Sequence, residues 1–126
     1  MMATGVKRAF DFILSPGNCH DAPYGRILMA RTGNRNNIKD LVMDRGYEDN
    51  YTRYTAQIEG FNPITPPKSN RKNPQKHDKE LYEKRNEIEC LFRLIQDFRR
   101  VFCRFDKLDD VYIGFIQIAL IFIAIR

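Results

Sequence analysis

The sequence predicts a small α/β protein, and three observations lead to this fold class. Short β-rich runs alternate with helix-forming segments in the first half of the chain, an order typical of a sheet with crossover helices. The second half contains a long amphipathic helix and a strongly apolar tail. The 126 residues, 43% hydrophobic and 29% charged, are enough for one hydrophobic core. We therefore predict a single domain over residues 1–126.

Three strands and two helices are expected in the first half. The strand-like runs are bounded by turn residues: Ala9–Leu14, Leu41–Met43 and Phe61–Thr65. The helices lie between them: Ala22–Arg31, ended by Gly33, and Glu48–Glu59, with acids at its start and Gly60 after its end. Because Pro63 has no backbone N–H to donate, we expect the third strand at an edge of the sheet.

The longest periodic segment runs from Asp78, a good N-cap, to about Phe102. Apolar residues recur in it at steps of three and four: Ile88, Leu91, Phe92, Ile95, Phe98 and Phe102. This stripe is expected to pack on the sheet. Polar residues recur at the same steps beside it: Tyr82, Arg85, Glu89, Arg93, Gln96 and Arg100. A single long helix would place all six of these on one side.

The tail from Val111 to Ile125 is almost wholly apolar, so a membrane anchor and a core helix are both open readings. Fifteen residues rise only about 22 Å as a helix, short of a hydrocarbon core of about 30 Å. Gly114 and Gln117 also interrupt the run. We therefore expect a buried core helix and no membrane span.

The chain carries 21 Lys and Arg against 16 Asp and Glu, and the excess is concentrated in Pro66–His77. That segment contains Lys68, Arg71, Lys72 and Lys76, no acid, and three prolines that prevent a helix or a sheet ladder. We expect an extended basic loop. Such a loop can approach DNA phosphates, and a solvated linker is the alternative.

Two carboxylates have positions suited to metal binding. Asp44 follows a predicted strand, where α/β sheets present functional groups, and Glu89 lies near the middle of the long helix. Together they could share Mg²⁺, which prefers oxygen ligands; ordinary surface acids are the alternative. Cys19, His20 and Asp21 are adjacent in a loop and are not expected to share a site. The sequence contains neither a Gly-rich phosphate loop nor a Gly-x-Ser-x-Gly elbow.

Cysteine usage and the N-terminus predict a cytoplasmic protein. The three cysteines, Cys19, Cys90 and Cys103, are an odd number without paired spacing, which argues against a disulfide framework and a zinc ribbon. The first ten residues contain no apolar segment of the kind found in secretory signals.

Several blocks together resemble the C-terminal part of DDE transposases of bacterial insertion sequences. In one branch of this family the third acid lies in a Tyr-x2-Arg-x3-Glu-x6-Lys signature, and Tyr82, Arg85 and Glu89 have that order and spacing. Further blocks match in family order: FILSPGNCHD, VMDRGYEDN, ITPPKSNRKNP, FRRVFCRFDKL and the apolar GFIQIALIFIAIR. The resemblance covers the chain from about Phe10 to Arg126.

The resemblance implies a partial ribonuclease-H-like fold, with a truncated mixed sheet and a long helix that carries the third acid. It implies Mg²⁺-dependent DNA cleavage and strand transfer at insertion-sequence ends. Asp44 would be the second catalytic, metal-binding acid and Glu89 the third. DNA-binding residues by the same resemblance are Lys68, Arg71, Lys72, Tyr82, Arg85 and Arg93. The implied partners are DNA and another transposase copy, and the implied location is the bacterial cytoplasm, at the nucleoid when bound to DNA.

The sequence departs from the family pattern at three points. The first acid is expected on a strand upstream of the segment matched by Phe10–Leu14, Gln96 stands at the final Lys of the signature, and Cys90 replaces a usual Arg. We therefore expect the isolated chain to have little or no strand-transfer activity and to leave an apolar face uncovered. The alternative is a non-enzymatic DNA-binding remnant.

Overall fold

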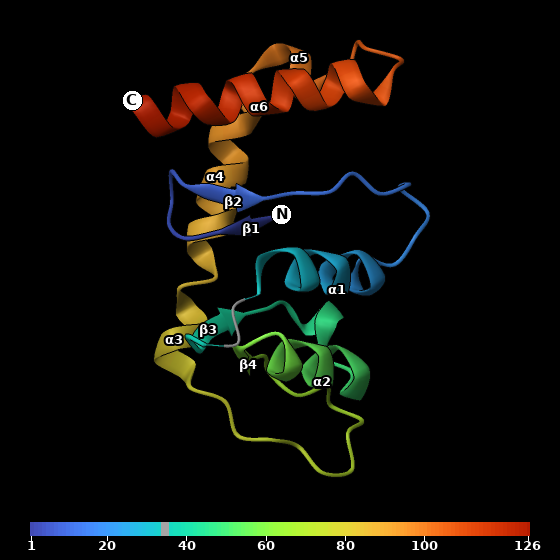
Figure 1. The fold of residues 1–126 in the computed structure, drawn as a ribbon, viewed down its shortest axis with the longest axis vertical. Helices are drawn as coiled ribbons and strands as arrows, with labels where there is room; N and C mark the ends of the chain where they lie inside the picture. Colours follow the sequence, from blue (N-terminus) through green and yellow to red (C-terminus); the bar gives the residue numbers. More distant parts are fainter. Residues whose placement is uncertain (34–35) are drawn as a thin grey trace. The chain divides into compact units, whose positions relative to one another are not determined.

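The computed structural model describes residues 1–33 and 36–126 as a mixed α/β structure with small sheets and several helices (Figure 1). The predicted α/β class is therefore confirmed. The chain divides into two compact units, one formed by residues 1–14 and 86–126 and the other by residues 15–85. We call them the terminal unit and the central unit and describe each by itself. The single domain over residues 1–126 stays a prediction.

The central unit is built around a strand–helix–strand arrangement. β3 (Lys39–Val42) and β4 (Phe61–Ile64) pair in parallel, and α2 (Asn50–Ile58) connects them. α1 (Asp21–Thr32) packs against α2, and α2 packs against β4 (Figure 1). The predicted second and third strands and both helices of the first half are confirmed, with boundaries shifted by a few residues. Pro63 lies in β4, which has one unpaired edge because its sheet contains only two strands.

Glycines allow two close turns in this unit. Gly60 follows α2 with a φ of +85°, a left-handed conformation that side chains disfavour, and so turns the chain directly into β4. Gly33 ends α1 by donating to the carbonyl of Met29. A Cβ at Gly33 would lie 2.5 Å from the carbonyl oxygen of Glu59, so the ends of α1 and α2 meet too closely for any side chain there.

The terminal unit contains a hairpin and three helices. β1 (Met2–Ala3) and β2 (Ala9–Asp11) pair antiparallel and lie against α4 (Asn86–Gln96). α5 (Arg99–Phe102) and α6 (Asp109–Ile125) follow, and α6 lies across the end of α4 (Figure 1). Buried residues of the three helices form the core of this unit: Leu91, Ile95, Val101, Ile116, Ala119 and Ile123. We call this set the terminal core.

The prediction of one mixed sheet is wrong for the described residues, which form two separate two-stranded sheets. The predicted first strand does not join β3 and β4. Instead its N-terminal part, β2, pairs with β1, a two-residue strand that the sequence did not indicate. Phe12 and Leu14, predicted as strand residues, lie beyond β2 and pack on the terminal core. A two-residue strand is too short to produce a recognisable alternation.

The prediction of a single long helix over residues 78–102 is also wrong. Its segment forms α3 (Lys79–Glu83), α4 and α5, with a tight turn at Lys84 and Arg85 and a second break at Phe98. The amides of Lys84 and Arg85 donate to the carbonyls three residues earlier, and Phe98 is extended. The break at Phe98 allows α5 to bury Val101 in the terminal core. The polar stripe is consequently divided among three elements.

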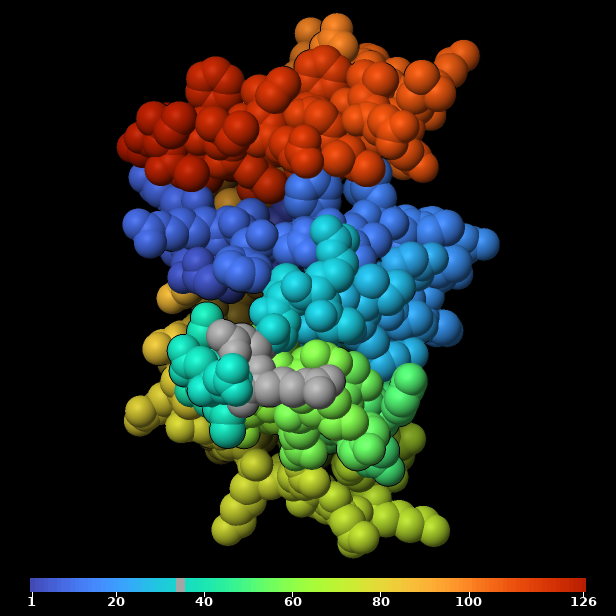
Figure 2. Space-filling model, viewed as in Figure 1, coloured from blue at the N-terminus to red at the C-terminus, as the bar shows by residue number. Residues whose placement is uncertain are grey.

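α6 buries only one face, although its sequence from Val111 to Ile125 is almost wholly apolar. Ile116, Ala119 and Ile123 are buried at steps of three and four, as an amphipathic helix would bury them. Within the terminal unit the opposite side exposes large apolar residues: Val111, Ile118, Ile121, Phe122 and Ile125. In Figure 2 the red band of α6 has no covering segment on the visible face. The expectation of a buried helix thus holds for one side only.

The start of α2 gives a testable pH dependence. The Asp49 carboxylate caps this helix by accepting from the amide of Thr52 at 2.7 Å and from its hydroxyl at 2.6 Å. Burial alone would raise the pKa of Asp49, but these hydrogen bonds and the charge of Arg26 lower it below its usual value of 3.8. The cap should therefore stabilise the fold fully above pH 3.8 and lose this effect as the pH falls through the lowered value.

Urea unfolding should show Asp49→Ala to be destabilised by about 1 kcal/mol near neutral pH. Asp49→Asn is the matched control, because asparagine caps helices but does not titrate. Below pH 3.8 the wild type should lose unfolding free energy relative to Asp49→Asn, because only the wild-type cap becomes protonated. A difference that stayed constant across this range would contradict the assignment.

Candidate metal and nucleic-acid site

Asp44 lies at the carboxyl end of β3, as the sequence predicts. The strand ladder continues one residue beyond β3, because the amide of the buried Met43 donates to Ile64 at 2.9 Å. The chain then leaves the sheet, and Asp44 is exposed. Its Oδ1 accepts from the amide of Arg45 at 2.6 Å and so caps the short 3₁₀ helix η1 (Arg45–Tyr47). The arrangement presents a carboxylate to solvent from a fixed turn.

The surroundings of Tyr47 indicate that a second acid, Asp21, lies near Asp44. Its half-buried hydroxyl has a raised pKa, first because of burial and then because of the charges of Asp21 and Asp44. The Tyr47 ring lies so close to α1 that a Cβ at Gly25 would be 2.5 Å from its Cε1. Asp21, in the first turn of α1, is therefore near enough to Asp44 to influence the same side chain. No pattern in the sequence associates Asp21 with Asp44.

Glu89 and Arg93 lie one turn apart on α4, with Glu89 partly buried and Arg93 exposed. Tyr82 lies on α3, and Arg85 follows it in the turn, with its guanidinium carbon 5.8 Å from the Tyr82 ring centroid. Tyr82 and Arg85 belong to the central unit, and Glu89 and Arg93 to the terminal unit.

The pairing of Asp44 with Glu89 as metal ligands stays a prediction, because the two residues belong to different units. Within residues 1–33 and 36–126, no group of three or more His, Cys, Asp or Glu side chains is arranged to hold a metal ion. The donor chemistry at Asp44 nevertheless suits Mg²⁺, since an exposed carboxylate can bind a hard cation that keeps several waters.

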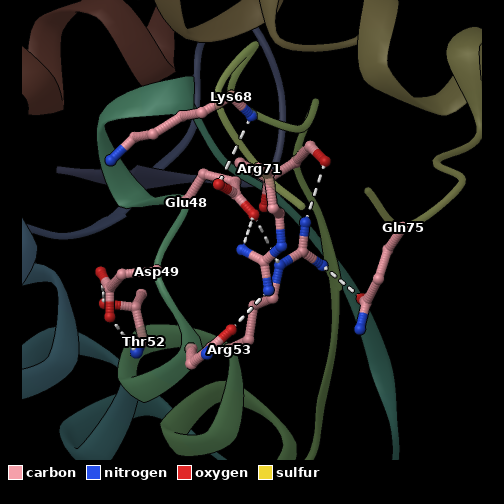
Figure 3. A network of polar contacts seen from close by, with 9 residues as sticks. Glu48, Asp49, Thr52, Arg53, Lys68, Arg71 and Gln75 are labelled. Atoms are coloured by element: carbon pink, nitrogen blue, oxygen red, sulfur yellow. Dashed lines mark hydrogen bonds and ion pairs between the residues drawn. The ribbon is translucent and has the colours of Figure 1, made fainter. Parts of the chain in front are cut away.

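The basic loop is attached to the central unit by a polar network (Figure 3). At its centre is Glu48, whose side chain is only 2% exposed. Its carboxylate lies 3.5 Å from Nε of Arg53, forms an ion pair with Arg71 and accepts from the backbone N–H of Lys68 at 3.4 Å. Arg53 in turn donates to the carbonyl of Thr65 and to Gln75, both at 3.1 Å.

Sequence reasoning missed Glu48 and Arg53. Glu48 was expected at the start of a helix, where an acid is normally exposed, but it lies before the Asp49 cap and points into the network. No pattern marks a buried ion pair when its partners, Arg53 and Arg71, are separated along the chain.

Lys68 and Lys72 are exposed in this loop, and Arg71 is partly buried. Lys72 lines an open cavity of about 440 Å³ at the start of α2, together with Asp49, Asn50, Arg71 and Asn73. Its lining is mainly polar and combines two cations, Arg71 and Lys72, with one carboxylate, that of Asp49. Its composition is compatible with a phosphate group approaching the loop.

Cys19, His20 and Asp21 lie at the start of α1. Cys19 is exposed and lies 3.8 Å from the side-chain oxygen of Asn18, and His20 occupies the N-cap position of α1 without a capping side-chain bond. Asp21 begins α1.

None of the helices within residues 1–33 and 36–126 combines the length and the apolar character needed to span a membrane.

Comparison with known proteins identifies the family. The family model of the transposase DDE domain matches residues 2–124. A protein from Brucella ovis, which bears the name of transposase for insertion sequence element IS6501, is 27% identical over 120 residues, covering 89% of this chain and 85% of its own length. No solved structure matches the chain. Since the family model covers almost the whole sequence, this protein belongs to the transposase DDE domain family.

Proposed function

We propose that this chain takes part in DNA transposition as the DNA-processing segment of an insertion-sequence transposase. The observation that carries the proposal is the family match over residues 2–124, combined with an exposed Asp44 at the end of a parallel strand. The Brucella ovis relative has the name of an insertion-sequence transposase, which agrees with this role. On this proposal the fold is a partial ribonuclease-H-like domain, and DNA is the partner.

In the proposed mechanism Asp44 and Glu89 contribute carboxylate oxygens to a magnesium site. The bound metal would activate the attacking hydroxyl and stabilise the leaving oxygen of the phosphodiester. Asp44 is suited to this role because the η1 cap fixes its Oδ1 side while the carboxylate stays exposed. Arg93, one turn from Glu89, and Tyr82 with Arg85 would contact DNA near the site. Lys68 and Lys72 would meet the phosphate backbone.

The isolated chain is proposed to have little strand-transfer activity. The family resemblance assigns it two of the three acids, and a metal that loses a shared ligand is held less well. DNA binding without chemistry is then the second candidate function, favoured by the exposed lysines of the anchored loop. A full-length transposase or a second copy would be its partner, at the nucleoid in the bacterial cytoplasm.

The metal assignment can be tested with Mn²⁺, a paramagnetic substitute for Mg²⁺. Substoichiometric Mn²⁺ should broaden the NMR signals around Asp44 and Glu89 together in the intact chain. Asp44→Asn should abolish the broadening around Glu89 because one ion is shared. Asp40→Asn is the matched control, since Asp40 lies on the same strand and accepts from Asn62 at 2.8 Å. Broadening around Glu89 that persisted in Asp44→Asn would disprove the shared site.

DNA chemistry needs a separate assay. With Mg²⁺ and a labelled duplex, the isolated chain should give no strand-transfer product but should bind the duplex, with an affinity that falls as salt rises. Robust cleavage that Glu89→Gln abolished would contradict the proposed inactivity and would confirm Glu89 as catalytic. Binding that did not weaken with salt would rule out attachment through phosphates.

A further inference from the structure

The segment from Thr65 to Gln75 is held in place by side chains of the central unit rather than by secondary structure. Three prolines in or beside it cannot donate backbone hydrogen bonds: Pro66, Pro67 and Pro74. Its attachment points are the Thr65 carbonyl, the Lys68 amide, the Arg71 guanidinium and the Gln75 amide group. All four are held by Glu48 and Arg53, two side chains that the solvent scarcely reaches.

The two Arg71 amino groups are both directed into this network. Nη1 forms the ion pair with the buried carboxylate of Glu48, and Nη2 donates to the side-chain oxygen of Asn50. The Arg71 side chain is 20% exposed. A guanidinium engaged in this way satisfies two acceptors with one planar fork. Both terminal nitrogens, which together form the fork that would bind a phosphate in bidentate fashion, are therefore already engaged with Glu48 and Asn50.

The neighbouring lysines have the opposite character. Lys72 is exposed, and within the described parts of the chain it has no ion-pair partner. Lys68 enters the network only through its backbone N–H, and Figure 3 shows its side chain extending away from Glu48. On this loop the Arg71 guanidinium therefore points into the network, whereas Lys68 and Lys72 are exposed to solvent.

We propose that Arg71 is a positioning residue, which through Glu48 fixes the loop so that Lys68 and Lys72 meet consecutive DNA phosphates. This inference rests on the proposed function and changes the role that the family resemblance gives to Arg71. Glu48 is the second positioning residue, because its carboxylate holds Arg71 and the Lys68 amide at once. The DNA-contacting groups are then the two lysines.

The advantage of this arrangement is preorganisation. A proline-rich, strongly basic loop without internal partners would have to be ordered at the moment of binding, which reduces affinity. The Glu48–Arg71 pair orders the loop before DNA arrives. The lysines keep the counterion-releasing contacts that supply affinity.

Fluorescence anisotropy with a labelled short duplex, from about 50 to about 200 mM salt, separates the two roles. Lys72→Ala should reduce the slope of log affinity against log salt by about 0.9, the value of one phosphate contact. Arg71→Gln should lower the affinity about tenfold with the slope unchanged, because ordering is lost but no phosphate contact is. Arg71→Lys should behave like Arg71→Gln, since an ammonium keeps the charge but lacks the planar fork.

A direct phosphate contact by Arg71 would give different results. In that case Arg71→Lys would retain nearly full affinity and Arg71→Gln would reduce the slope as Lys72→Ala does. Either result would overturn the inference while leaving DNA binding intact. If instead the wild type bound the duplex without any salt dependence, the proposed function itself would fail.

Hydrogen exchange gives a readout that does not depend on DNA. The amide of Lys68 should be protected in the wild type and should lose protection in Arg71→Gln and Arg71→Lys, whereas Lys72→Ala should leave it unchanged. Unchanged protection of Lys68 in both Arg71 variants would mean that Arg71 does not order the loop. This outcome rejects the inference even when the proteins bind DNA normally.

Discussion

Glu48→Ala should lower the free energy of unfolding of the central unit by about 3–5 kcal/mol. The substitution removes the carboxylate that pairs with Arg53 and Arg71. The Arg53 side chain, which belongs to a residue only 7% exposed, then lacks this counter-charge. Removing one partner of a buried ion pair costs more than the pair contributes, because the remaining charge is left away from water. Urea denaturation followed by circular dichroism measures the loss, and hydrogen exchange of α2 shows whether it lies in this unit.

Glu83→Ala is the matched control for this experiment. Glu83 is exposed on α3, and its truncation should change the unfolding free energy by no more than about 0.5 kcal/mol. Glu48→Gln should fall between the two, because an amide of the same size keeps one acceptor oxygen for either the Lys68 or the Arg71 hydrogen bond, which now go to different oxygens. If Glu48→Ala were as mild as Glu83→Ala, the network would be an ordinary surface ion pair and could not position the loop.

The elements of the central unit could be predicted because their signals are local. Asp49 accepts bonds that begin α2, Gly60 adopts the left-handed turn that ends it, and each residue acts within a few positions of its own place in the sequence. The partnering of strands is not local. β1 and β2 are too short to show the alternation of apolar and polar residues that marks a strand. Their pairing in a sheet separate from β3 and β4 therefore could not be predicted.

The broken helix shows a competition that periodicity cannot reveal. Residues 78–102 repeat at helical spacing throughout, yet Phe98 is extended, because burying Val101 beneath α6 requires the chain to turn there. Tertiary packing overrides an intrinsic preference of a few tenths of a kcal/mol per residue. Of the predicted apolar stripe, Leu91 and Ile95 are buried, but Phe92 and Phe102 are exposed. The predicted continuity of the helix was wrong.

In the candidate site, too, local features could be predicted from the sequence and long-range contacts could not. Asp44 follows apolar strand residues and is exposed at the strand end, as its position in the sequence suggests. The interior role of Glu48 depends on Arg53 and on Arg71, which is 23 positions away. Arg71 has the same sequence surroundings as Lys72, and only the structure distinguishes the inward cation from the outward one.

Leu91→Ala should destabilise the terminal unit by about 2–5 kcal/mol. Leu91 is fully buried at the centre of the terminal core, where α4, α5 and α6 meet. Its truncation removes apolar contacts and leaves a cavity that close-packed neighbours fill only in part. The change should be read from urea denaturation and from faster hydrogen exchange of α4 and α6.

Leu108→Ala is the matched control, because it deletes the same atoms from a side chain that is 69% exposed. Its cost should stay within about 0.5 kcal/mol. Since Leu91 lies two residues after Glu89 on the same helix, loosening α4 should also weaken any metal response at Glu89, whereas Leu108→Ala should not. Equal costs for the two leucines would mean that α6 does not pack on α4 as described, and the helix proposed to hold the third acid would lack its support.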